Sequence, residues 1–271
     1  MSTQTLNAAE NPALANQLTS KMAQDTAPVK ERALITPPYD TVVNLPGGYV
    51  TFAGEVVTEA EVRELNGKDE EAIARAGTMG KVLTTILSRG TVRVGAESAT
   101  EEILDQMFAG DRDALLLGIY KATFGPTADV PTFCKGCSDY REIRVDVDED
   151  IKVRKLSDPI ADRKFTVKGK KAEYTVVLPS GKVQKELTIN PDKNLAELTT
   201  ILLEGTVVEI NGSRVFSKAQ IQEIGLADRR VIADALSKKT FGPVLEDVRA
   251  TCPDCGGEVV APINVGTLFR F

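Results

Sequence analysis

The feature that most constrains this chain is a pattern that occurs twice at a nearly constant spacing. The segment TILSRGTV from Thr85 returns as TILLEGTV from Thr200, with six of eight residues identical. The segment DRDALLLGIYKATFGP from Asp111 returns as DRRVIADALSKKTFGP from Asp228, with seven of sixteen identical. A Cys-x-x-Cys motif follows each copy, and the three offsets are 115, 117 and 118 residues. Ordered matches at one offset are typical of an internal duplication.

Each copy is interpreted as strand, turn, strand, helix, short link, helix, cysteine knuckle and strand. LPGGYV at 45–50 predicts a strand, a glycine turn and a second strand, and VLPSGKV at 177–183 is taken as its counterpart. Asp111 is expected to cap a helix. The stripes expected to be buried on the two equivalent helices are Ala114, Leu115 and Ile119 in the first copy, and Val231, Ile232 and Leu236 in the second. The fold class predicted is α+β, internally duplicated about a pseudo-twofold axis.

Two more helices are expected, one in each copy. Asn66 begins the first, which runs to a stop at Gly90 with weak points at Gly77 and Gly80. Pro191 opens the second, which carries leucines at helical spacing. The predicted organisation is a flexible N-terminal tail at 1–35, a first repeat at 36–150, a basic linker or hairpin at 151–172, and a second repeat at 173–271.

Composition removes several classes of function. The chain has no histidine, which excludes Ser/His and Cys/His nucleophile pairs and imidazole metal ligands. It carries 33 Lys and Arg against 39 Asp and Glu, a formal charge of −6, which argues against general nucleic-acid binding. No apolar run approaches the roughly 20 residues that span a bilayer, and the N-terminus lacks a signal pattern. The chain is therefore expected in the cytosol, with reduced cysteines.

The two cysteine motifs predict one shared metal site. Cys134 and Cys137 form CKGC, and Cys252 and Cys255 form CPDC. A closed structural zinc site takes four ligands, whereas each motif supplies two. The 114 residues between the motifs are too many for one contiguous zinc ribbon. If the chain is duplicated, each copy contributes half of the site, so we expect one structural zinc per chain that joins the two repeats.

Other readings of the cysteines stay open at this point. Each pair could be a thioredoxin-like dithiol, although neither stands at a helix start after a strand. The metal could have been lost, or another subunit could complete each site. A catalytic zinc is disfavoured, because four thiolates leave no open position for water.

Three weaker candidates are interpreted without a binding role. The acidic run at 146–150 is expected to be the outward face and end of a strand, in preference to a cation site. The basic stretch at 152–171 is expected to be a solvated or partner-facing hairpin, in preference to a nucleic-acid contact. Ser180 and Ser217 have no base to activate them. We therefore expect no enzyme activity.

The order of these segments resembles the baseplate proteins of tailed phages, typified by the baseplate hub subunit of T-even phages. The segments that carry the resemblance are TPPYDTVVNLPGGYV from Thr36, VRELNGKDEEAI from Val62, the helix from Asp111 that ends in TFGP, and the cysteine motif after it. LPSGKV and CPDCGG match the later part of the pattern. The resemblance covers roughly residues 36–271. Lys121 stands where the family pattern has an arginine.

The resemblance implies a non-enzymatic part of a phage tail baseplate, either kept in the particle or acting during assembly in the host cytoplasm. Its partners would be other baseplate and tail proteins; no membrane contact is expected, and nucleic acid is disfavoured as a partner. The alternative from another class is a zinc-ribbon protein that binds nucleic acid or acts in transcription. A redox protein is a third possibility, supported only by the dithiols.

Overall fold

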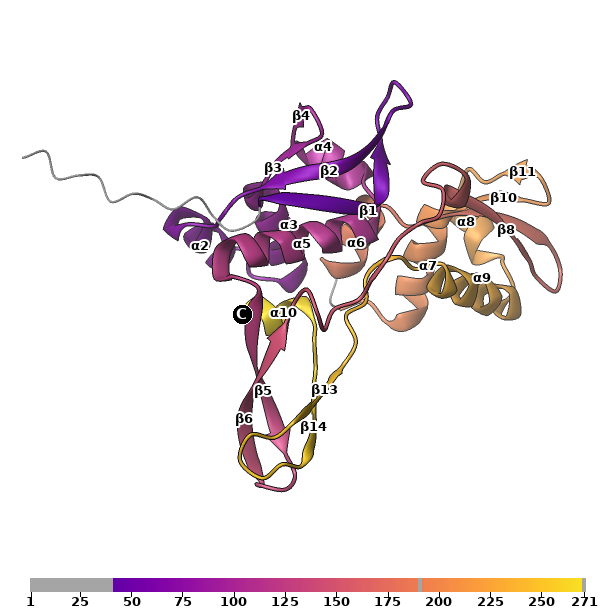
Figure 1. Cartoon of the computed structure of the whole chain (residues 1–271). Helices are drawn as coiled ribbons and strands as arrows, with labels where there is room; N and C mark the ends of the chain where they lie inside the picture. The colour runs from indigo at the N-terminus through magenta and orange to yellow at the C-terminus, as the bar shows by residue number, and fades with distance from the viewer. Residues whose placement is uncertain (1–40, 190–191, 270–271) are drawn as a thin grey trace, which may run out of the picture. The chain divides into compact units, whose positions relative to one another are not determined.

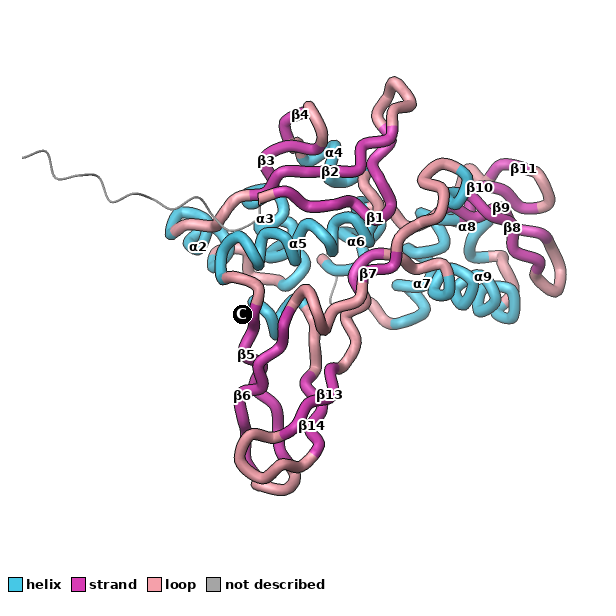
Figure 2. Tube along the Cα trace, viewed as in Figure 1, coloured by secondary structure: helices cyan, strands magenta, loops and turns pink. Residues whose placement is uncertain are grey.

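The fold contains two antiparallel sheets of four strands (Figure 1). In each of them, strands that follow one another in the sequence are neighbours in the sheet. The computed structural model describes residues 41–189 and 192–269, which fall within one unit spanning 38–271. The tail predicted at 1–35 lies outside the described residues. Figure 2 shows helices interspersed with the strands along the chain. The protein is therefore a mixed α and β chain built from several small antiparallel sheets.

The first sheet and its helices come from the first half of the chain. They are β1 (Val42–Val50), β2 (Val56–Val62), α2 (Gly67–Ala74), α3 (Met79–Gly90), β3 (Thr91–Val94), β4 (Glu97–Ser98), α4 (Glu101–Gln106) and α5 (Ala109–Phe124). Helix α5 approaches β1 closely, since a Cβ at Gly118 would lie only 2.1 Å from Val43. Ile86, Leu115 and Ile119 are completely or almost completely buried in the core between the sheet and α3 and α5. The predicted stripe of α5 is thus buried.

Two sequence predictions in this half are wrong. LPGGYV is not strand, turn and strand: it lies within β1, where the four residues 45–48 face a single residue of β2. This bulge accommodates Pro46 and a positive φ at Gly48 without ending the strand. The helix expected from Asn66 to Gly90 is two helices, because Gly77 adopts φ +73° between α2 and α3. Asn66 does begin α2, in a capping box with Asp69.

The second sheet and its helices follow the same order of strands. They are β8 (Lys164–Lys168), β9 (Glu173–Val177), α6 (Gly181–Thr188), α7 (Leu195–Thr206), β10 (Val207–Ile210), β11 (Ser213–Arg214), α8 (Lys218–Gln222) and α9 (Leu226–Lys238). Val176, Leu203 and Ile232 lie at the centre of a core that is separate from the first. The hairpin predicted in the basic stretch is present as β8 and β9, with its turn at Gly169.

Three predictions for this half need correction. VLPSGKV does not correspond to LPGGYV, because residues 181–183 begin helix α6. Helix α7 begins at Leu195 with Asn194 as its N-cap, and not at Pro191. Val231 is 41% exposed, whereas Ile232 and Leu236 of the same predicted stripe are buried. Val231 therefore lies outside the buried face of α9.

Two β-hairpins extend from the first core and carry the cysteines. They are β5 (Thr127–Cys134) with β6 (Asp139–Asp146), and β13 (Val248–Thr251) with β14 (Glu258–Ala261). Strand β5 contacts β14, and the helix α10 (Val265–Phe269) after β14 contacts α5 and β5. The remaining elements are β7 (Val153–Arg154), the 3-10 turn η2 (Ala161–Arg163) and β12 (Gly242–Pro243). The end of the chain therefore packs into the core of its first half.

Candidate metal centre

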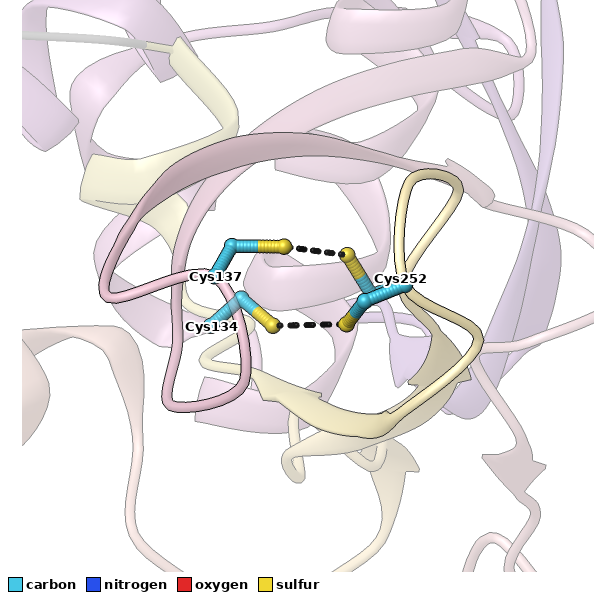
Figure 3. Close-up of side chains that lie close together, drawn as sticks. Cys134, Cys137 and Cys252 are labelled. Carbon is cyan, nitrogen blue, oxygen red and sulfur yellow. Dashed lines mark hydrogen bonds between the residues drawn. The ribbon is translucent and has the colours of Figure 1, made fainter.

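The four cysteines meet where the turns of the two hairpins face one another (Figure 3). The Cys134 and Cys255 sulfurs are 3.5 Å apart, and the Cys137 and Cys252 sulfurs are 3.7 Å apart. All four Sγ atoms lie within 4.8 Å of one another. The prediction that the two motifs bring their four sulfurs together in one cluster is confirmed.

The local backbone of the two turns explains this convergence. The residue after the second cysteine adopts positive φ in both motifs, +55° at Ser138 and +70° at Gly256. In the second motif the Gly256 N–H donates to the Cys252 carbonyl at 3.0 Å. A Cβ at Gly136 would lie 3.0 Å from the Cys255 sulfur, so this glycine leaves room for the opposite motif. Both turns thus curl their sulfurs toward one point.

The electrostatics of the cluster favour a bound cation. Backbone N–H groups of Cys255 and Asp254 donate to the Cys252 sulfur and lower its pKa to about 7. The hydrogen bond to Cys255, with those to Cys252 and Cys134, raises the pKa of Cys137 to about 12. Without a cation, the crowded sulfurs share protons, since four adjacent thiolates would repel one another. A coordinated divalent metal deprotonates thiols outright and removes that repulsion.

The distances fit a tetrahedral metal better than they fit disulfides. With Zn–S bonds of about 2.3 Å, tetrahedral sulfurs lie about 3.8 Å apart. The two measured pairs are near this value, whereas a disulfide needs about 2.05 Å. Each motif stands in a hairpin turn and not at a helix start, so the geometry is not that of a thioredoxin-like dithiol. The four cysteines could hold one metal ion and would leave it no open position.

An arginine that the sequence reasoning did not single out links the two turns. Arg141 of β6 donates to Asp254 of the other motif at 2.5 Å and to Asp139 at 2.7 Å. These two carboxylates raise the pKa of the guanidinium further above its usual range. No local spacing connects residues 141 and 254, so only the folded chain reveals this contact.

The acidic run at 146–150 and Ser217, which the sequence also offered as candidates, make hydrogen bonds within the fold. In the acidic run, Asp146 accepts from the backbone N–H groups of residues 148 and 149, as in an ordinary turn. Ser217 caps helix α8. Within the residues that the structure describes, the cysteines are the one group of metal-binding side chains gathered in this way.

Asp111 does not cap α5, contrary to the prediction. Phe108 occupies the N-cap position, and the Asp111 side chain accepts from the Gly47 N–H at 2.7 Å, across to the β1 bulge. Burial raises the pKa of Asp111 to about 6, although the N–H groups of Gly47 and Gly48 and the Arg163 guanidinium oppose the shift. The carboxyl therefore holds the bulge against the helix.

Asp228 of α9 makes the corresponding contact in the second half. It accepts from the N–H groups of Lys170 and Lys171 at 2.6 and 3.1 Å, and from the Tyr174 hydroxyl at 2.9 Å. Burial acts to raise its pKa, but these three donors outweigh burial, and the pKa is lowered. Each Asp thus fixes a glycine-containing segment of its own sheet. The sequence shows that the Asp-Arg pair is repeated, but it does not show which segment each Asp contacts.

Comparison with protein-family models, with curated proteins and with solved structures found no match to this chain. Among the described residues, no helix is both long and apolar enough to cross a membrane.

Proposed function

We propose that this protein is a non-enzymatic structural or assembly component of a phage-type tail baseplate. It acts through protein–protein contacts, and its four cysteines hold one structural zinc. The observation that carries the proposed structural role is the cysteine cluster, whose ligands come from segments more than a hundred residues apart. Such a metal ties the end of the chain to its first half and makes one stiff body. A body of fixed shape suits a part that must hold neighbours at a set geometry.

Zinc is the metal that this set of ligands suits best. Four thiolates in a tetrahedral arrangement select zinc or an iron–sulfur centre among common biological metals. The sulfur pairs at 3.5 and 3.7 Å match the edges of a tetrahedron around a single ion. A closed set of four protein ligands contributes to folding and offers no site for a reacting water.

We also propose that the body is an internal duplication with a pseudo-twofold axis. The two sheets have the same strand order, β1-β2-β3-β4 and β8-β9-β10-β11. In both, the segment between the second and third strand contains two helices, and two more helices follow the fourth. Asp111 and Asp228 each reach from the last of these helices to the first hairpin of their own sheet.

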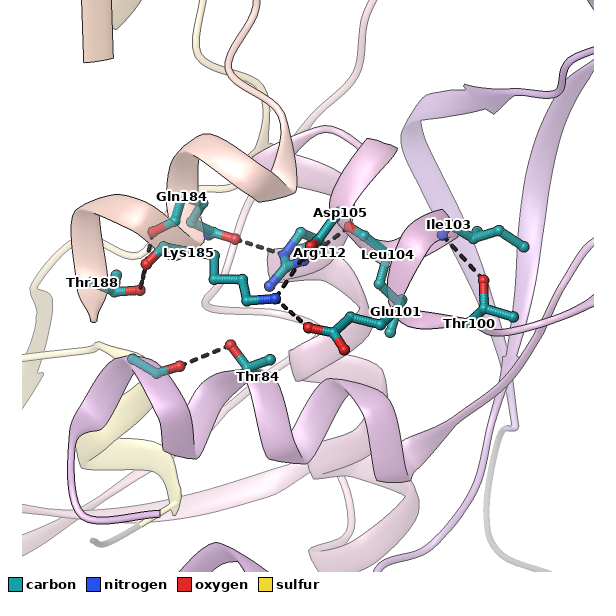
Figure 4. A network of polar contacts seen from close by, with 11 residues as sticks. Thr84, Thr100, Glu101, Ile103, Leu104, Asp105, Arg112, Gln184, Lys185 and Thr188 are labelled. Atoms are coloured by element: carbon teal, nitrogen blue, oxygen red, sulfur yellow. Dashed lines mark hydrogen bonds and ion pairs between the residues drawn. The ribbon is translucent and has the colours of Figure 1, made fainter. Parts of the chain in front are cut away.

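The arginine after each Asp supports the duplication independently. Arg112 donates to the carbonyl of Leu104, and Arg229 donates to the carbonyl of Ile221, each exactly eight residues earlier. Arg112 also reaches Gln184 of α6 at 2.9 Å, within the polar network of Figure 4. That network joins α4 and α5 to the second half, with Lys185 between Glu101 and Asp105. A shared origin of the two halves would explain why the same buried arginine-to-carbonyl hydrogen bond occurs in both.

The absence of a catalytic role rests on the chain's chemistry. Histidine does not occur anywhere in it, and the cysteine sulfurs face one another. The assignment to a baseplate rests on the family resemblance of residues 36–271. In this role the chain meets its tail-protein partners in the host cytoplasm, and the particle retains it if it is structural.

Complementation of a strain that lacks this protein, with tail assembly as the readout, tests the proposal. A strain that lacks this protein should accumulate incomplete tails, and the wild-type chain should restore them. A Cys134→Ser chain should restore them less well, whereas a Lys135→Ala chain, altered at an exposed non-ligand in the same turn, should behave like wild type. Normal tails without this protein would contradict the proposal.

One observation favours the nucleic-acid alternative enough to test it. Phe133 and Tyr140 lie side by side on β5 and β6, with ring centroids 5.5 Å apart, and they are 51% and 67% exposed. Exposed aromatic rings can stack on unpaired bases. A titration with single-stranded DNA and RNA decides this: binding lost in the Phe133→Ala, Tyr140→Ala double variant would support the alternative. Nearby carboxylates such as Asp139 act against it.

A further inference from the structure

The first hairpin continues beyond the point where Asp111 holds it. After the bulge, β1 and β2 pair again from Tyr49 to Val57, and the turn closes with a hydrogen bond from Gly54 to Thr51. We call residues 49–57 the arm, and Figure 1 shows it reaching past the rest of the sheet. Phe52 stands in its turn with 90% of its surface exposed.

The second sheet shows that such an extension is not needed for this topology. The hairpin of β8 and β9 ends at Gly169 to Lys171, directly where Asp228 holds it. The arm contributes to the first core only at its base, through buried Tyr49 and half-buried Val57, and residues 50–56 are outside both cores. The arm with its exposed Phe52 is therefore an addition that this topology does not require, and a projecting aromatic side chain can anchor a contact when a partner buries it.

The arm and its base carry negative charge. Residues 49–60 contain Glu55 and Glu59 and neither lysine nor arginine. Burial raises the pKa of Tyr49, and the charges of Glu97 and Glu102 raise it further, so carboxylates surround the base as well. A surface that accepts the arm should therefore combine an apolar floor with cations.

The same chain has a concave site with these properties. A cavity of about 500 Å³ lies between the segment at 154–157 and the C-terminal end of α9. Its apolar lining comes from half-buried Leu156 and from Phe241, of which 7% is exposed. The charged residues around it are four cations and one carboxylate, namely Arg154, Lys155, Lys238, Lys239 and Asp162. Asp162 lies 3.9 Å from Lys239, and Glu246 lies 4.0 Å from Arg154. Lys155 and Lys238 add two further positive charges to the lining, so the cavity keeps an excess of positive charge.

We propose that the arm of one copy of this chain docks into the cavity of a second copy. Phe52 covers Leu156 and the exposed part of Phe241, and Glu55 lies among the cations of the rim. Burial of an aromatic side chain at the centre supplies most of the affinity, while the charges set the orientation and speed the encounter. The contact joins two different surfaces, so it builds a closed ring or an open chain of copies unless two copies exchange arms.

Self-association of the full chain, measured by sedimentation over a range of concentrations, tests this contact. The wild type should associate, and Phe52→Ser should weaken association by about tenfold or more. Phe216→Ser is the matched control, because Phe216 is 80% exposed but lies outside the arm and the cavity. It should associate like the wild type. Raising the salt concentration should weaken the wild-type contact, because charges form its rim.

Exchanging the charges identifies the two surfaces. Glu55→Lys and Lys238→Glu should each weaken self-association, and mixing the two variants should restore binding of one to the other, since the altered arm then meets the altered cavity. Both sites are exposed, so the metal content and thermal melting of the variants should stay as in the wild type. A wild type that is monomeric throughout, a Phe52→Ser chain that associates normally, or a mixture that does not associate would each overturn the proposal.

Discussion

In both halves of this molecule an aspartate on a helix contacts a hairpin, but the pKa of the carboxyl is raised in the first half and lowered in the second. Asp111 is fully buried at the β1 bulge, where Oδ1 accepts from Gly47 and Oδ2 lacks a donor at hydrogen-bond geometry. Asp228 is almost as buried but accepts from two backbone N–H groups and a tyrosine hydroxyl. Burial alone therefore does not decide the pKa of a carboxyl. The number of donors that face it does.

The halves also differ in what else holds them together. The first sheet shares its core with both cysteine hairpins, whereas the second sheet has a core of its own. Cys134 and Cys252 are both buried within the first core. The metal should thus matter to the first half and to the end of the chain, and matter far less to the second sheet.

The largest effect should come from removing a sulfur. Cys134→Ser and Cys255→Ser should each abolish metal binding and lower stability by several kcal/mol, because the binding free energy of a structural metal is folding free energy. Hydrogen exchange should report lost protection in both hairpins and retained protection in β9 and β10. Lys135→Ala is the control for the turn itself. Loss of protection confined to the hairpin that carries the substitution would show that the motifs do not share a metal.

A smaller effect should distinguish the two aspartates by pH. The Asp111 pKa is raised from 3.8 to about 6 on folding, so its contribution is favourable below pH 4 and is lost as the pH rises through 6. The change is about 3 kcal/mol at most, at 1.36 kcal/mol for each unit of pKa. Denaturant unfolding of Asp111→Asn across this range should lack that fall in stability.

Asp228 should behave in the opposite way. Its pKa is lowered on folding, so its contribution is present above pH 4 and is lost as the pH falls through the folded-state value. Asp228→Asn should therefore remove part of the acid sensitivity of the second sheet, as measured by exchange at β9. If both Asn variants changed the pH profile in the same direction, the contrast between the halves would be wrong.

The smallest effects should come from glycines beside the aspartates. A Cβ at Gly47 would lie 2.8 Å from Asp111, and a Cβ at Gly169 would lie 2.6 Å from Asp228. Gly47→Ala and Gly169→Ala should each cost about 1–3 kcal/mol through overpacking. Gly67→Ala is the matched control, because nothing lies within 4 Å of its added Cβ. If thermal melting showed that Gly67→Ala destabilises the protein as much as the other two variants, close packing of these glycines against the aspartates would not be the cause.

Local sequence signals predicted the parts of the fold whose causes are local. The basic hairpin at Gly169 and the α5 stripe follow from alternation and helical spacing. The cysteine cluster was predictable because its ligand count has a chemical rule: two motifs of two sulfurs make one closed site. The break between α2 and α3 was marked by Gly77, but a helix tolerates some glycines, so spacing alone could not place it.

Long-range contacts account for what the sequence did not reveal. The bulge of β1 is held by Asp111, 64 residues away from Gly47. Taken alone, the segment predicts a turn, because its Pro and Gly residues are typical of one. VLPSGKV resembles LPGGYV in composition, yet it enters α6, where a Cβ at Gly181 would meet Arg112 at 2.5 Å. In both cases a partner elsewhere in the chain decides what the segment becomes.

We propose that one zinc ion joins the two cysteine motifs. X-ray absorption at the zinc edge, together with metal analysis of protein purified without chelator, tests it most directly. We expect one zinc per chain with four sulfur neighbours at about 2.3 Å. No metal, two ions per chain, an iron–sulfur spectrum, or nitrogen and oxygen neighbours in place of sulfur would contradict it.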